Sequence, residues 1–98
     1  MRTMIRIKMQ VEAGNRAFQD GTLQKTMMEA IERLKPEAAY FSPSDGKRSG
    51  MMFFDLAEPS QIVEVAEPLF MNLDADVEIV PVMNGDDLRK GLAKAGAK

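Results

Sequence analysis

The sequence predicts an α+β fold in which four strands form one antiparallel sheet, in the order 4-1-3-2, with helices on one face. Three observations predict it. Hydrophobic patterns of period 2 and period 3.6 follow one another along the chain in the order β-α-β-β-α-β. An Asp45-Gly46 turn joins the two middle strands as a hairpin. Pro81 falls in the last strand and confines that strand to a sheet edge. With 98 residues, the chain forms a single domain, residues 1–98.

The N-terminal strand has the clearest pattern. Its apolar residues alternate with charged or polar ones, as in a strand with one buried face, and they are Ile5, Ile7, Met9 and Val11. Gly14 and Asn15 are expected to end it.

A helical segment in two parts is expected next. The first part spans residues 13–18 and stops at Asp20-Gly21. In the second, apolar residues recur at helical spacing from Leu23 to Leu34. Because the step between the two parts breaks the phase of the pattern, we expect a kink or two helices. Thr22 is the expected N-cap of the second part, and Pro36 closes the segment.

Residues 38–42 and 50–56 are the two strands of the predicted hairpin. The residues between them include Pro43-Ser44-Asp45-Gly46, which favours a turn. Since residues 50–56 are almost wholly apolar, the pattern is typical of a strand buried on both faces.

The next helix is expected to begin at Glu58-Pro59-Ser60. Its apolar residues keep helical spacing from Ile62 to Leu73, and Pro68 lies inside the pattern, where it should bend the helix.

The last strand is predicted at residues 77–83, followed by a short helix. Asn84 has the side chain of a good N-cap, and Asp86 and Asp87 fall in the first turn, where they complement the helix dipole. The tail from Gly91 is expected to fray.

This order of elements is the split βαβ pattern of a ferredoxin-like fold. Two right-handed crossovers place both helical segments on the same face of the sheet. The residues expected to face the helices are Ile5, Ile7, Met9, Met52, Phe54, Leu56, Val77 and Ile79. Those expected on the other face, called here the open face, are Arg6, Lys8, Gln10, Tyr40, Met51, Phe53, Asp55, Glu78, Val80 and Val82.

The open face is expected to need a partner. Met51, Phe53, Val80 and Val82 together would form a larger exposed apolar patch than monomers usually carry. The simplest cover is the same face of a second copy, so we expect a homodimer.

An open, two-faced sheet with this element order resembles the dimeric α+β barrel superfamily, whose ferredoxin-like subunits pack sheet to sheet around an enclosed space. The resemblance covers essentially all 98 residues. It implies a homodimer that binds a small molecule, because members include muconolactone isomerase-like enzymes, cofactor-free monooxygenases and haem enzymes. The chain is most similar to the small bacterial members without an assigned activity. Haem-binding members typically use a His ligand, and this sequence has none, so no cofactor is expected.

The candidate ligand-binding residues are those expected to project into that space: Arg6, Lys8, Tyr40, Phe53, Asp55 and Glu78. The two cations would bind a carboxylate or phosphate, and the two aromatic rings would pack on its apolar part. Alternatively, the cations pair internally with Asp55 and Glu78, as buried charges usually do. Tyr40 could also serve as an acid with either carboxylate as base.

These alternatives leave two functions open. One is a small-molecule-binding barrel, as an isomerase-like or monooxygenase-like enzyme without a cofactor, acting on an anionic or aromatic compound. The other is a non-catalytic dimerisation or regulatory module with an interior filled by side chains. No catalytic residue is assigned.

Composition excludes several other classes. With 13 basic and 15 acidic residues, the net charge of −2 argues against nucleic acid and anionic membranes as partners. The absence of Cys and His removes disulfides, thiolate nucleophiles and the usual zinc sites, so no metal is expected. Since apolar runs are too short for a signal peptide or a membrane span, we expect a cytoplasmic protein of bacterial type.

Overall fold

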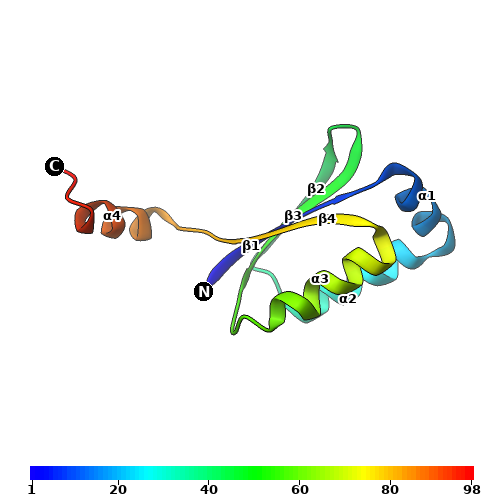
Figure 1. Cartoon of the computed structure of the whole chain (residues 1–98), viewed down its shortest axis with the longest axis horizontal. Helices are drawn as coiled ribbons and strands as arrows, with labels where there is room; N and C mark the ends of the chain where they lie inside the picture. Colours follow the sequence, from blue (N-terminus) through cyan, green and yellow to red (C-terminus); the bar gives the residue numbers. More distant parts are fainter.

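The computed structural model describes all 98 residues and contains four strands and four helices (Figure 1). In chain order these are β1 (Arg2–Met9), α1 (Val11–Asp20), α2 (Thr22–Leu34), β2 (Ala38–Ser44), β3 (Lys47–Asp55), α3 (Gln61–Leu73), β4 (Ala75–Pro81) and α4 (Gly85–Lys94).

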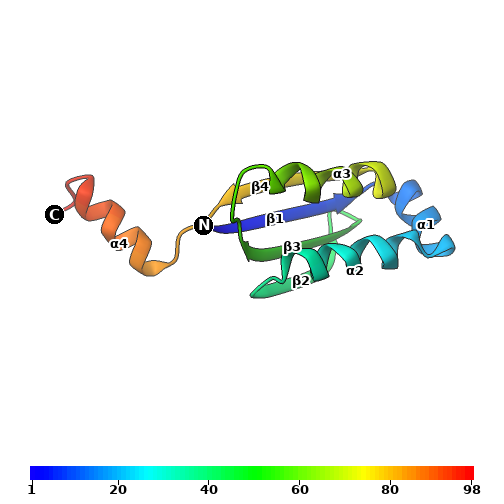
Figure 2. The same ribbon diagram turned by 90° about the horizontal axis from the view of Figure 1, so that it is seen from below.

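The four strands form one sheet in the order β2-β3-β1-β4, with every neighbouring pair antiparallel. This is the predicted order. Pro81 ends β4, which pairs only with β1, so the residue that cannot donate to a ladder lies at an edge, as expected. Helices α2 and α3 lie side by side on one face of the sheet, and α1 lies at one end (Figures 1 and 2).

The core lies between the sheet and these helices. Ile5 and Ile7 of β1 and Met52 of β3 are at most 1% exposed, and Leu69 and Leu73 of α3 are fully buried. Leu56, Val77 and Ile79 are partly buried against this cluster. The prediction of which side chains face the helices is therefore confirmed.

The β2–β3 hairpin turns at two residues. Asp45 and Gly46 both have positive φ angles, 53° and 73°, the geometry of the tight turn whose twist matches that of paired strands. The expectation that β3 is buried on both faces is wrong. Met52 and Phe54 are buried, but Met51 and Phe53 are only partly so, because no element of the chain covers the open face.

The first strand ends earlier than predicted. Val11 begins α1 instead of extending β1, and Gly14 lies within the helix, donating its backbone N–H to the Gln10 carbonyl at 2.8 Å. Gln10 is the N-cap of α1 and does not belong to the open face. The alternation breaks after Met9, where one apolar residue fits either element.

The division into two helices is confirmed, but Thr22 is not the N-cap of the second. Gly21, at φ 86°, occupies that position, and Thr22 donates its backbone N–H to Asp20 Oδ1 at 2.9 Å. A bend between the two helices requires a positive φ, which glycine adopts without steric cost.

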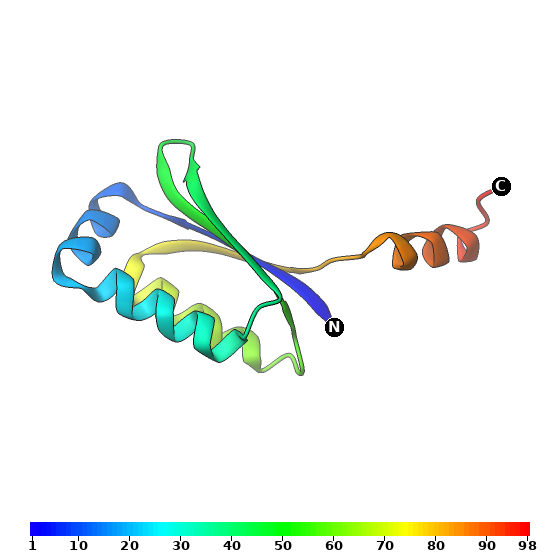
Figure 3. The ribbon, with the colours of Figure 1, turned by 180° about the vertical axis from the view of Figure 1, so that it is seen from behind.

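The C-terminal part leaves the rest of the molecule. β4 begins at Ala75 and ends at Pro81, two residues earlier at each end than predicted. α4 continues to Lys94, past the predicted fraying at Gly91, and contains no buried residue. Figure 3 shows it beyond the end of the sheet, on the side opposite α1. None of the helices combines the length and the hydropathy that crossing a membrane requires.

The open face as a candidate site

The open face is organised in rows, because paired residues of neighbouring antiparallel strands project to the same side. Three rows run across all four strands in the order β2, β3, β1, β4. We name them by their composition. The apolar row is Ala38, Phe53, Met4 and Val80; the mixed row is Tyr40, Met51, Arg6 and Glu78; the polar row is Ser42, Ser49, Lys8 and Asp76.

The apolar row contains no polar side chain from one sheet edge to the other. Met4 is only 8% exposed, because Phe53 and Val80 flank it on either side. Phe53 and Val80 themselves stay partly exposed. A continuous apolar row on an uncovered sheet is the feature that a second surface would bury.

The mixed row joins apolar contact with charge. Arg6 Nη1 lies 3.6 Å from Glu78 Oε1, and Arg6 Nη2 lies 3.9 Å from the sulfur of Met4. At the other end of the row, on edge strand β2, the side chain of Tyr40 is 67% exposed. Arg6 therefore has a carboxylate partner, whereas the Tyr40 ring is free to contact another molecule.

In the polar row, Lys8 forms an ion pair with Asp45 at the tip of the β2–β3 hairpin. Its ammonium lies 2.8 Å from Asp45 Oδ2. The hydrogen bond from Lys8 and its positive charge hold the pKa of Asp45 below its usual value. Both candidate cations are thus matched by carboxylates of their own chain, although Lys8 pairs with Asp45 and not with Asp55 or Glu78.

Asp55 lies apart from the other candidates. It pairs with Arg2, one row beyond the apolar row, and accepts from the N-terminal ammonium at 2.6 Å. The fold brings Arg6, Tyr40 and Glu78 into one row, with Phe53 and Lys8 in the rows on either side. Asp55 is the candidate that the structure separates from this group.

Sequence reasoning missed two members of the apolar row and one ion-pair partner. Met4 has the same strand parity as Arg6 and Lys8, so starting the strand at Met4 would have placed it on the open face. Ala38 could have been found in the same way from Tyr40. Asp45 was assigned only to the turn, and nothing in the sequence indicates that the hairpin tip reaches Lys8.

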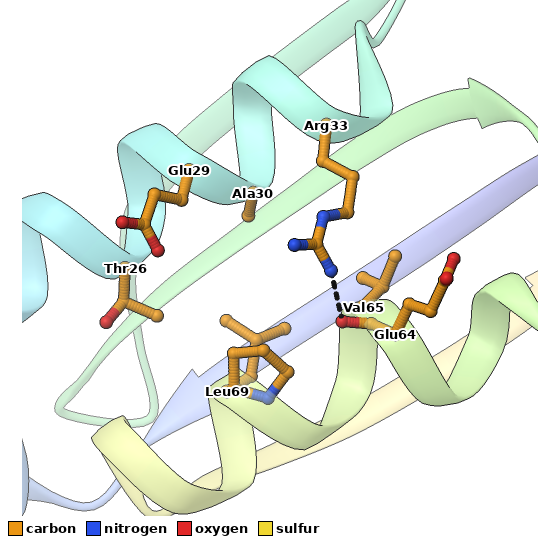
Figure 4. A pocket seen from close by; sticks show the side chains of 8 residues that line it. Thr26, Glu29, Ala30, Arg33, Glu64, Val65 and Leu69 are labelled. Atoms are coloured by element: carbon orange, nitrogen blue, oxygen red, sulfur yellow. Dashed lines mark hydrogen bonds between the residues drawn. The ribbon is translucent and has the colours of Figure 1, made fainter.

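Cavities within one chain are small or open. Between α2 and α3, eight residues line a cavity of about 20 Å³, where Arg33 of α2 donates to the carbonyl of Glu64 at 3.0 Å (Figure 4). That volume holds about one water molecule. On the open face, Arg6, Lys8, Asp76 and Glu78 border a shallow hollow of about 220 Å³. The hollow is large enough for a small ligand, but no part of the chain covers it from the solvent side.

The chain contains no cluster of three or more His, Cys, Asp or Glu side chains that could hold a metal ion. No protein-family model matches the chain, and no curated protein matches it in sequence. The open face is therefore the feature of this chain that bears most directly on its function.

Proposed function

We propose that this chain is a ferredoxin-like domain that forms a homodimer of the dimeric α+β barrel kind, with a small-molecule site between the two open faces. The apolar row carries the proposal. Of its four side chains in line across the sheet, Ala38, Phe53 and Val80 stay partly exposed to water in a single chain, and a facing sheet removes them from it.

Charge on the open face supports the same partner. Arg2, Arg6 and Lys8 make β1 basic, and Asp76 and Glu78 make the adjoining β4 acidic. The face therefore carries both signs of charge on neighbouring strands. The surface is complementary to itself, which a two-fold interface requires.

The ligand site would lie over the mixed row. The exposed ring of Tyr40 and the partly exposed Phe53 offer aromatic contact, and Arg6 can exchange Glu78 for an anionic group of a ligand. The second sheet would close the hollow beside Arg6 and Lys8.

A second candidate, a dimerisation module with a filled interior, is favoured by a specific observation. Arg6 and Lys8 already have carboxylate partners at 3.6 and 2.8 Å, so neither needs a ligand for charge balance. In this case the interior holds side chains and nothing else.

Sedimentation equilibrium of matched phenylalanine variants tests the dimer. Phe53→Asp places a charge in the apolar row and should give a folded monomer. Phe70→Asp changes a 45% exposed phenylalanine on α3, away from the open face, and should stay dimeric. A monomeric wild-type protein, or a Phe53→Asp variant that dimerises like wild type, would refute sheet-to-sheet packing. Circular dichroism checks that both variants are folded.

Native mass spectrometry of the dimer and of Arg6→Met separates the two functions. A ligand site predicts a reproducible extra mass on the wild-type dimer that the Arg6→Met dimer has lost. A filled interior predicts no extra mass and a weaker Arg6→Met dimer, because the variant then breaks an interface ion pair.

A further inference from the structure

The C-terminal helix is well formed by local interactions. At its N-terminus, Asp87 donates its backbone N–H to Asn84 Oδ1 at 2.8 Å, and Asn84 donates to Asp87 Oδ2 at 3.1 Å, a complete capping box. At its C-terminus, Gly96 has a φ of 91°, and Ala97 donates to the carbonyl of Leu92 at 2.9 Å. Both ends of the helix are therefore capped by hydrogen bonds from neighbouring residues of the chain.

Only the start of this helix lies near the sheet, where Asn84 and Asp87 border an open pocket with Arg2 and Asp55; its apolar side chains have nothing to pack against. Leu88 and Leu92 are one turn apart on one face and are 47% and 48% exposed, and Met83 in the preceding link is 68% exposed. We call these three residues the apolar stripe of α4. An isolated helix of ten residues is marginal in water, and most helical stability in proteins comes from packing of the apolar face. A capped amphipathic helix without a contact surface indicates a missing partner.

The link to α4 directs the helix away from its own sheet. Val82 donates its backbone N–H to the Arg2 carbonyl at 3.1 Å, so the chain stays in line with β4 up to that residue. Only Met83 and Asn84 remain before α4, and two residues span at most about 7 Å. Figures 1 and 2 show the result, a helix projecting beyond the end of the sheet.

We infer that α4 is an arm that packs its apolar stripe against a second copy of this chain; the inference rests on the proposed homodimer. The apolar stripe of α4 could pack on the open face of its own chain only if the chain turned back after Val82. The surface of a facing copy lies within reach of α4 without such a turn. The arm adds a contact to the dimer that the sheets alone do not provide.

The exposed area of the chain agrees with such an interface. A compact monomer of 10.9 kDa exposes about 5,600 Å², whereas this chain exposes 6697 Å². The excess of about 1,100 Å² exceeds the roughly 800 Å² that each partner buries in a standard interface. The radius of gyration, 15.6 Å, likewise exceeds the roughly 13 Å of a compact chain of this length. The open face and the arm together are large enough to form a stable dimer interface.

A pair of matched double variants tests the arm in the full chain. L88S/L92S removes the apolar stripe, and K90S/K94S makes the same replacements on the opposite side of the helix. The dissociation constant of the dimer, measured by sedimentation equilibrium at physiological salt, should rise at least tenfold for L88S/L92S and less than threefold for K90S/K94S. Equal constants for L88S/L92S and wild type would overturn the inference.

A chain ending at residue 83 serves as the second variant. Since α4 contains no buried residue, this shorter chain should keep the wild-type circular dichroism of the sheet and of α1–α3. It should dimerise as weakly as L88S/L92S. A shorter chain that dimerises as tightly as wild type would also overturn the inference.

A spin label locates the surface that the arm contacts. The chain has no cysteine, so K94C carries a single label at the end of α4. In a dimer of labelled K94C and ¹⁵N-labelled wild type, amide signals of the wild-type copy should broaden. In a control sample, the spin label and the ¹⁵N label are on the same copy. If signals broaden only in this control, α4 folds back on its own chain, and the inference fails.

The outcomes separate this inference from the proposed function. A dimer lost in Phe53→Asp but unaffected by L88S/L92S keeps the sheet-to-sheet proposal and rejects the arm. A dimer lost in L88S/L92S but unaffected by Phe53→Asp keeps the arm and rejects sheet-to-sheet packing. A monomeric wild-type protein rejects both.

Discussion

At the scale of single residues, Asp45 contributes to both the turn and the open face. Its positive φ of 53° helps form the tight hairpin, and its carboxylate holds the ammonium of Lys8 at 2.8 Å. A turn residue therefore neutralises a cation of the candidate site. The carboxylate of Asp45 is 79% exposed to solvent. The ion pair therefore changes the local charge of the open face and adds little to the stability of the core.

The pKa of Asp45 is expected to lie below that of an ordinary aspartate and to rise towards it in Lys8→Met. Lys8 lowers this pKa by a hydrogen bond and by its charge. Since the folded pKa is the lower one, the pair stabilises the fold above about pH 3.9 and loses this effect as the pH falls through the folded pKa. Carboxyl chemical shifts followed by NMR between pH 2 and 6 measure it.

Asp20 provides the control for this titration. Its pKa is also lowered, but by hydrogen bonds from the side chain and backbone N–H of Thr22, so Lys8→Met should leave it unchanged. If Asp45 kept its lowered pKa in the variant, the pairing with Lys8 would be wrong.

At the scale of elements, the β2–β3 hairpin depends on a glycine opposite a phenylalanine. Gly50 pairs with Phe41, whose ring lies over the glycine so closely that a Cβ there would be 2.5 Å from ring atom Cδ1. An aromatic ring over a strand glycine supplies the contact that the missing side chain would have made. The glycine thus fixes how the edge strand packs, on the side of the sheet that faces the helices.

Gly50→Ala is expected to lower the free energy of unfolding by about 1 kcal/mol, the lower end of overpacking costs, because the half-exposed Phe41 ring can swing aside. In the Phe41→Ala background the same change should cost close to nothing, since the clashing ring is gone. Urea unfolding of wild type, Gly50→Ala, Phe41→Ala and the double variant gives the coupling free energy between the two positions. Equal costs in both backgrounds would show that the ring does not occupy this position.

At the scale of the whole molecule, the chain is long and thin, with extents of 54 × 28 × 18 Å. Helices α2 and α3 cover one face of the sheet, and the other face and the C-terminal helix stay uncovered (Figure 1). A thin layer of this kind has one buried core, and its second hydrophobic surface remains available for association. The proposed dimer uses both uncovered parts.

The melting temperature is expected to depend on protein concentration. For a dimer that dissociates as it unfolds, a hundredfold increase in concentration raises Tm by roughly 7 °C for a pair of chains of this size. Differential scanning fluorimetry from 1 to 100 μM measures the shift, and the Phe53→Asp variant should show none. A Tm that is constant for wild type would contradict folding coupled to dimerisation.

The sequence alone was sufficient for the strand order and the buried face. Alternation places Ile5, Ile7 and Met52 towards the helices, and Pro81 requires an edge strand, because both depend only on local geometry and on the missing N–H of proline. The mixed row follows from the same parity once the order is known. Element ends were less predictable: Val11 suits a strand and a helix equally, and the structure begins α1 there, with the Gly14 N–H donating to the Gln10 carbonyl.

Tertiary structure decided which charges meet and where the chain ends in space. The partner of Lys8 is Asp45, 37 residues away, at the tip of the β2–β3 hairpin, and no sequence pattern indicates that the two side chains meet. The separation of Asp55 from the candidate group likewise follows from strand register. The sequence determined that α4 is a capped amphipathic helix, since caps are local; that it projects from the sheet with its leucines uncovered depends on the backbone path through Val82, which is a property of the folded sheet.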